Sequence, residues 1–161
     1  MIENTSQHTN SAGVRILPGY IFLPCAALSI AAELRLTLPH IPLPQPASLY
    51  AGIIIAVAAL LLALSGLKRF LSQKVNPVPY KPAASLVSSG IYRFTRNPMY
   101  VGFVGMLAGA TVALGSLPFM ASTVVMFVFL NSYAIPREEA YLTRTFGEDY
   151  KNYCRRVRRW L

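Results

Sequence analysis

The sequence predicts an all-α integral membrane protein. It has four expected transmembrane helices, the last two a tight helical hairpin, and a cytoplasmic C-terminal amphipathic helix. Of its 161 residues, 54% are hydrophobic and only 13% are charged, whereas charged residues make up roughly a quarter of a soluble domain. Long uncharged runs alternate with short polar segments, and the basic residues collect in those segments. We therefore expect a single membrane domain over residues 1–161.

The basic residues, which give a formal net charge of +9, point to a membrane surface as the partner. Because they lie between apolar runs, they fit anionic lipid headgroups better than nucleic acid. The two cysteines have different surroundings: Cys25 lies in an apolar run and Cys154 in a basic segment. Neither a disulfide nor a metal site is expected from them.

The first half of the chain contains two predicted spans. Residues 1–15 are polar and are expected to be mobile. The apolar stretch over about residues 16–35 is about long enough to cross the ~30 Å hydrocarbon core. After a proline-rich connection, residues 47–67 form a run of 21 residues without a charge, which is the clearest transmembrane pattern here.

The long polar connection over residues 68–97 carries the strongest topological signal. It holds six basic residues and no acidic one: Lys68, Arg69, Lys74, Lys81, Arg93 and Arg96. The positive-inside rule places this loop in the cytoplasm. The short connections at 39–46 and 116–118 carry no charge, so we expect them outside, with both termini in the cytoplasm.

The second pair of spans is predicted as a helical hairpin. Asn97 to Pro136 is a run of 40 residues without a charge, too long for one ordinary span, and Gly115 to Pro118 supplies a turn near its middle. We expect helices over 98–115 and 117–135. Gly102, Gly105 and Gly109 fall on or near one face, which favours close packing of helices in lipid; room for a ligand against the backbone is the alternative.

Residues 136–161 are predicted to form the amphipathic cytoplasmic tail. Apolar residues recur every three or four positions from Leu142 to Trp160, with Gly147 as a break. The other face is basic: Arg144, Lys151, Arg155, Arg156, Arg158 and Arg159. Such a segment can lie on an anionic membrane surface or fold back over the cytoplasmic ends of the spans.

Two polar motifs are candidates for a site. Residues 90–102 place Arg93 and Arg96 at a predicted helix start, where exposed backbone N–H groups and the helix dipole attract an anion; Pro98 suits the first turn. Basic residues beside a span are also ordinary topology markers. Because the hairpin returns the chain to the same face, Glu138 and Glu139 should lie near Arg96. Carboxylates, arginines and aromatics together can hold a zwitterionic cofactor.

These motifs resemble the isoprenylcysteine carboxyl methyltransferase family. The resembling residues are Gly90, Tyr92, Arg96, Asn97, Pro98, Tyr100, Gly102, Glu138, Glu139, Phe146, Gly147, Tyr150 and Tyr153. More broadly, the chain is similar to integral-membrane methyltransferases that include phosphatidylethanolamine N-methyltransferase. The resemblance covers about residues 86–160, and the first two spans match only in being spans.

The resemblance implies a cofactor, S-adenosylmethionine, and residues that bind it: Arg96, Asn97, Pro98, Tyr100, Gly102, Glu138 and Glu139. It implies catalytic roles for Arg96 and for Arg156, the latter near the acceptor carboxylate. Asn97 replaces the histidine of many family members. An amide forms hydrogen bonds but does not titrate near neutrality, which puts a general-base role at this position in doubt.

The resemblance also implies a lipophilic or prenylated acceptor that enters from the bilayer. A carboxylate acceptor is favoured, because it is already ionised at neutral pH, whereas an amine would need a base. N- or S-methylation of a phospholipid or small molecule stays open. Two further hypotheses are a reductase relative that uses NADPH and a membrane adaptor without enzymatic activity, and cofactor preference separates them from a methyltransferase.

Overall fold

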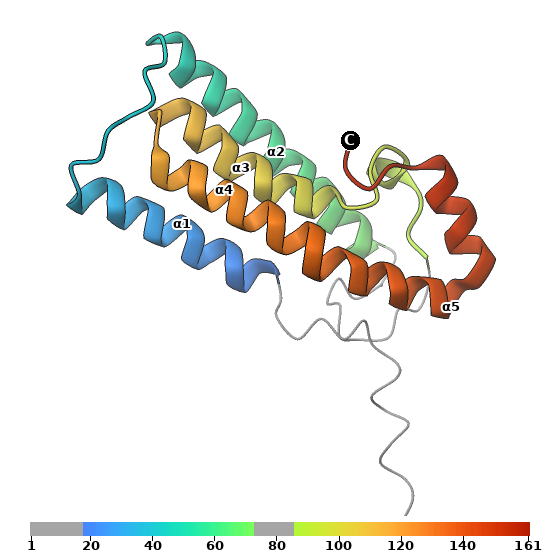
Figure 1. The fold of residues 1–161 in the computed structure, drawn as a ribbon. Coiled ribbons are helices and arrows are strands. Elements are labelled where there is room, and N and C mark those ends of the chain that lie inside the picture. Colours follow the sequence, from blue (N-terminus) through green and yellow to red (C-terminus); the bar gives the residue numbers. More distant parts are fainter. Residues whose placement is uncertain (1–17, 73–85) are drawn as a thin grey trace, which may run out of the picture.

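The structure is a computed structural model that describes residues 18–72 and 86–161, and these residues are almost entirely helical (Figure 1). Within them, strand-like pairing is limited to isolated bridges between single residues. The helices in chain order are α1 (Pro18–Arg35), α2 (Ala47–Ser72), the 3₁₀ helix η2 (Gly90–Arg93), α3 (Pro98–Leu114), α4 (Leu117–Phe129), the π-helix η3 (Leu130–Ala134) and α5 (Ile135–Arg156). The all-helical class predicted from the sequence is confirmed.

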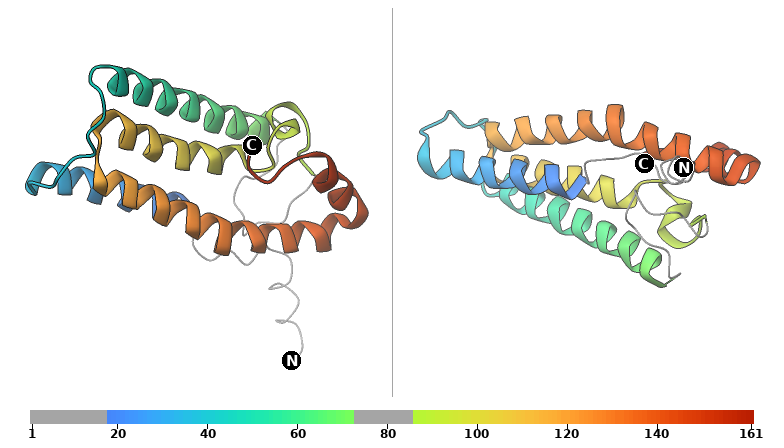
Figure 2. Two further views of the ribbon diagram at one scale, coloured as in Figure 1. Left: turned by 45° about the horizontal axis from the view of Figure 1, so that its top comes forward. Right: turned by 90° about the horizontal axis from the view of Figure 1, so that it is seen from below.

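Helices α1 to α4 lie side by side as a bundle, and α5 continues the line of α4 beyond one end of it (Figures 1 and 2). At that end, α5 turns back towards η2 and the start of α3, and the C-terminus lies in the same region. The main apolar core lies between α1, α3 and α4 and includes Leu107, Met126 and Leu130. The polar residues described below therefore gather at one end of the bundle.

Helices α2 and α3 are packed backbone to backbone. A Cβ atom added to Gly102 would lie 2.5 Å from Ala63 Cβ, and one added to Gly109 would lie 2.7 Å from the carbonyl oxygen of Gly52. Both distances are far inside van der Waals contact. The glycine face of α3 therefore packs on α2, which confirms the packing interpretation over the ligand alternative along this face.

The predicted hairpin between α3 and α4 is present. Gly115 ends α3 with φ 62°, in the left-handed region that glycine adopts without strain. Ser116 then caps α4, and its side chain accepts a hydrogen bond from the Phe119 N–H. Ser116 also donates to the Glu33 carboxylate at the end of α1. The uncharged turn is thus tied to the first helix.

The predicted boundary at Pro136 is not where the helix ends. The π-helix η3, with the Ile135 N–H bonded to the Leu130 carbonyl, carries the chain from α4 into α5. A π turn is a common way to accommodate a residue that lacks an N–H. The helix direction changes instead at Gly147, whose φ of 52° and ψ of −123° are not helical. The break predicted at Gly147 is confirmed.

Two helices are long and apolar enough to cross a membrane: Ala47–Arg69, with 23 residues, and the continuous helix Leu117–Arg156, with 40. The apolar helix α3 is shorter. Large apolar side chains on these elements face outwards, among them Ile54, 67% exposed, and Val124, 56% exposed. An outward surface of this kind fits a lipid environment. The four-span arrangement itself stays a prediction.

Candidate functional site

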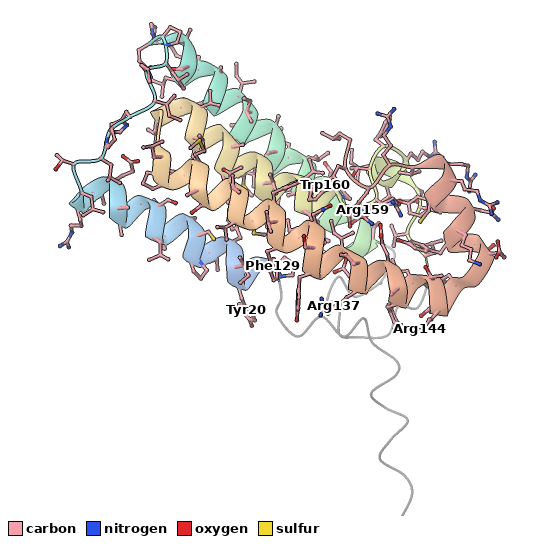
Figure 3. The ribbon with its side chains drawn as sticks, in the orientation of Figure 1. Tyr20, Phe129, Arg137, Arg144, Arg159 and Trp160 are labelled. Carbon is pink, nitrogen blue, oxygen red and sulfur yellow. The ribbon has the colours of Figure 1, made fainter. Side chains whose placement is uncertain are left out.

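The candidate site lies at the end of the bundle where α3 begins, α5 begins and the C-terminal residues return (Figure 2). Arg159 and Trp160 approach this region from the C-terminal segment, and Arg137 lies on the neighbouring turn of α5 (Figure 3). Residues that are more than 35 positions apart in the sequence meet here, as the bond between Tyr100 and Glu138 illustrates. The hairpin brings the two predicted motifs together, as expected.

The start of α3 is held by the C-terminal segment. Pro98 is buried in the first turn, and Asn97 occupies the N-cap position without a side-chain cap bond. Instead, the Asn97 amide donates to the Arg159 carbonyl oxygen at 2.9 Å. The Thr95 hydroxyl donates to the same oxygen at 3.3 Å and accepts from the Asn97 N–H at 3.1 Å. The amide at position 97 thus binds backbone.

Tyr100 and Glu138 form the first carboxylate contact of the site. Tyr100 is buried one turn into α3 and its hydroxyl donates to Glu138 Oε1. Glu138 lies beyond Pro136, where the uncharged run ends. Burial raises the pKa of Glu138 to about 7, the Tyr100 hydrogen bond lowers it in part, and the charge of Glu139 raises it further. This carboxylate therefore titrates near neutrality.

Glu139 is held by two arginines. Its Oε1 lies 3.1 Å from Arg96 Nη1 and accepts from Arg159 Nε at 3.0 Å, while its Oε2 accepts from Arg159 Nη2 at 2.6 Å. The paired contact from Arg159 is the strong two-point geometry of guanidinium and carboxylate. The hydrogen bond to Glu139 raises the pKa of Arg159, although burial opposes the shift.

Arg96 is the central side chain of the cluster. Its side chain is 14% exposed, and Nη1 also donates to Cys154 Sγ at 2.6 Å. Its Nε atom is buried without a hydrogen-bond partner among the described residues. Two arginines facing one glutamate leave one formal positive charge in excess. A buried donor beside excess positive charge is suited to an anionic ligand.

The C-terminal segment after α5, residues 157–161, crosses the site in extended form. The Arg96 N–H donates to the Arg158 carbonyl oxygen at 3.0 Å. Trp160 Nε1 donates to Asn131 Oδ1 in η3 at 3.2 Å, and the Trp160 and Phe127 ring centroids are 5.1 Å apart. The segment therefore links the start of α3 to the π-helix.

A buried tyrosine cluster supports the site from behind. The Tyr153 hydroxyl donates to the Tyr92 carbonyl oxygen at 2.7 Å, and both residues pack with Tyr150 and Val157. Burial raises the pKa of Tyr150 and of Tyr153. These phenols stay neutral at physiological pH. The cluster fixes η2 against the second half of α5, which in turn positions Arg96 next to Glu139.

Two predicted site residues lie apart from the cluster. Gly102 faces Ala63 and Ala59 of α2. Arg156 is exposed, and its Nε donates to the Asn152 carbonyl oxygen in its own helix at 3.3 Å. Conversely, Arg159 lies in the cluster although helical spacing placed it on the basic face. That spacing fails because α5 ends at Arg156, so the last residues do not share the helical face pattern.

Comparisons with known proteins give the chain its family. A model of the phospholipid methyltransferase family matches residues 47–149. Three relatives are named as methyltransferases. A probable protein-S-isoprenylcysteine O-methyltransferase of Oryza sativa subsp. indica is 35% identical over 50% of this chain and 42% of its own length. The protein-S-isoprenylcysteine O-methyltransferase of Schizosaccharomyces pombe is 38% identical over 45% and 30%. Methanethiol S-methyltransferase 1 of Bradyrhizobium diazoefficiens is 37% identical over 42% and 22%.

The chain spans less than half the length of each of these three relatives. No solved structure matches the chain. The family model, however, covers well over half of the chain and includes both motifs that form the cluster, from Arg96 to Glu139. The chain therefore belongs to the phospholipid methyltransferase family.

Proposed function

We propose that this chain is a membrane methyltransferase that uses S-adenosylmethionine to methylate a lipophilic acceptor, with the carboxylate of an isoprenylcysteine-like substrate as the favoured acceptor. The observation that carries the proposal is the convergence of Arg96, Tyr100, Glu138 and Glu139 at one end of the bundle. Relatives at 35% and 38% identity whose names specify isoprenylcysteine O-methylation support the acceptor.

The residues of the cluster fit the charges of this cofactor. When bound, S-adenosylmethionine supplies a methyl group already activated on a sulfonium, together with an ammonium and a carboxylate. The buried, unpartnered Nε of Arg96 is a donor suited to the carboxylate. Glu138, which contacts Tyr100, is suited to a cation. The chain needs mainly to align donor and acceptor and to exclude water.

An acceptor carboxylate requires no proton transfer, because it is ionised at neutral pH. Asn97, whose amide binds the Arg159 carbonyl oxygen, is not needed as a base for this reaction. Arg156 stays a prediction for the acceptor carboxylate: its guanidinium is exposed at the end of α5. A sulfur acceptor is the second candidate, favoured by the relative named methanethiol S-methyltransferase 1.

The proposed topology places the cluster at the cytoplasmic face. Four spans over about residues 16–35, 47–67, 98–115 and 117–135 would put both termini and the basic connection 68–97 in the cytoplasm. The outward apolar surface of α2 and α4 supports a multi-pass arrangement. The cofactor would enter from the cytosol and the acceptor from the bilayer.

The test is binding of tritiated S-adenosylmethionine to the purified full chain in nanodiscs, with NADPH as the competing candidate. We expect saturable binding of the methyl donor that Arg96→Ala weakens by roughly tenfold or more, because a charged hydrogen bond is lost. Arg93→Ala is the matched control, since Arg93 is exposed three residues earlier.

Binding of NADPH without the methyl donor would favour a reductase relative. Binding of neither ligand by a folded sample would leave a membrane adaptor as the explanation. Equal donor binding by wild type and Arg96→Ala would contradict the site assignment.

A further inference from the structure

The two adjacent glutamates do different work, and Arg159 is what separates them. We propose that Arg159 is a positioning residue: with Arg96 it engages Glu139 completely, so that these three side chains bind the carboxylate of the methyl donor, and Glu138 alone is left to face its cationic groups. This inference rests on the proposed function and assigns the amino-acid end of the donor to two subsites.

The first argument is the occupancy of the Glu139 oxygens. Oε1 lies 3.1 Å from Arg96 Nη1 and accepts from Arg159 Nε at 3.0 Å, and Oε2 accepts from Arg159 Nη2 at 2.6 Å. The contacts leave Glu139 little capacity for a further cation. The strong anion binder of this cluster is therefore the arginine pair, with Glu139 as the brace between the two guanidiniums.

The second argument is the donor capacity that remains. A guanidinium has five N–H donors. Arg159 uses two of its nitrogens on Glu139, and its side chain is 36% exposed, so part of it stays accessible to a ligand. The Nε of Arg96 is buried without a partner among the described residues. A ligand carboxylate between the two arginines would receive donors from both.

The third argument is the way the chain fixes Arg159. The Asn97 amide and the Thr95 hydroxyl both bind the Arg159 carbonyl oxygen, at 2.9 Å and 3.3 Å. The next residue, Trp160, is bound to Asn131 and stacked near Phe127. Arg159 is thus held on both sides by long-range contacts, as a positioning side chain requires. The family resemblance assigns it no role.

Glu138 has the complementary environment. Its contact is the neutral Tyr100 hydroxyl, and none of the ion pairs among the described residues includes it. A carboxylate solvated by one hydroxyl and no guanidinium retains its attraction for a cation. The ammonium and the sulfonium of the methyl donor are the cations that the proposed function brings to this place.

The test compares two ligands that differ in one group: S-adenosylmethionine and decarboxylated S-adenosylmethionine, which keeps the sulfonium and the amine but lacks the carboxylate. Dissociation constants are measured for wild type, Arg159→Ala, Arg159→Lys and Glu138→Gln. Arg158→Ala is the matched control, because Arg158 is exposed and contacts Arg96 through its backbone.

We expect Arg159→Ala to weaken S-adenosylmethionine about tenfold or more and decarboxylated S-adenosylmethionine less than about threefold. Arg159→Lys should recover part of the loss, because a lysine keeps the charge but not the two-point contact. Glu138→Gln should weaken both ligands alike. Arg158→Ala should change neither.

A merely structural role of Arg159 is separated by fluorescence. Trp160 is the only tryptophan of the chain, so its emission in detergent micelles reports whether the C-terminal segment stays docked. An unshifted emission maximum in Arg159→Ala together with a selective loss of S-adenosylmethionine supports the proposal. Equal weakening of both ligands, or no weakening, would overturn it while the proposed function stands. Failure of wild type to bind either ligand would overturn both.

Discussion

The replacement Gly102→Ala separates helix packing from ligand contact at a residue that the family resemblance assigns to the cofactor. The added Cβ would lie 2.5 Å from Ala63 Cβ and 2.7 Å from the Ala59 carbonyl oxygen. The optimal separation of two carbon atoms is about 3.5–4.0 Å. The first contact is thus at least about 1 Å too short, and the second involves backbone that cannot rotate away.

Overpacking of this kind costs about 1–3 kcal/mol of unfolding free energy. The gain in helix propensity from glycine to alanine returns up to about 1 kcal/mol. We therefore expect a net loss of about 1–2 kcal/mol, seen as a lower melting temperature of the purified protein in micelles by Trp160 fluorescence. Gly19→Ala is the control, because a Cβ there meets nothing within 4 Å.

The double variant Gly102→Ala with Ala63→Gly should recover part of the loss. It removes the Cβ contact but keeps the contact with the Ala59 oxygen, so the two changes should couple by about 0.5 kcal/mol or more. An unchanged melting temperature of Gly102→Ala, with weaker methyl-donor binding, would refute the packing argument and return Gly102 to the ligand.

The remaining predictions concern the electrostatics and the backbone of the site. Because burial raises the pKa of Glu138 to about 7 and its ionised form attracts a cation, methyl-donor affinity should rise between pH 5.5 and 7, below the range where α-amino groups titrate; a flat calorimetric profile for wild type would contradict this, and Glu138→Gln should be flat. The same shift means that this group makes the protein less stable as pH rises from about 4.5 to 7, since the folded state then holds more protons. Gly147→Ala should cost about 1–3 kcal/mol, because φ 52° with ψ −123° is strained for any other residue while no atom lies near its Cβ; a thermal melt with no loss would show that the bend tolerates a side chain.

Local patterns in the sequence were enough for the helices and for the meeting of the two motifs. The uncharged run from Asn97 to Pro136 and the turn at Gly115 imply a hairpin, and a hairpin returns the chain to the face where it began. The bond from Tyr100 to Glu138 and the ion pair of Arg96 with Glu139 follow from that geometry. Composition and helix periodicity act over a few turns, so these features could be inferred without tertiary contacts.

The position of Arg159 could not be inferred in this way. Helical spacing extended to Trp160 placed Arg159 on the outer basic face, but α5 ends at Arg156. The direction of the last residues is decided by hydrogen bonds to Thr95, Arg96 and Asn97, about 60 positions away in sequence, and no local pattern encodes them.

The sequence by itself determined the all-helical class, the hairpin, the break at Gly147 and the residues of the two motifs, because charge, turn chemistry and periodicity are local properties. The tertiary structure decided which glycine neighbours are helices, which arginines meet Glu139 and which carboxylate remains without a cation. Those outcomes depend on how α5 bends at Gly147 and on where the C-terminal segment finds partners. Both are set by contacts between distant parts of the chain.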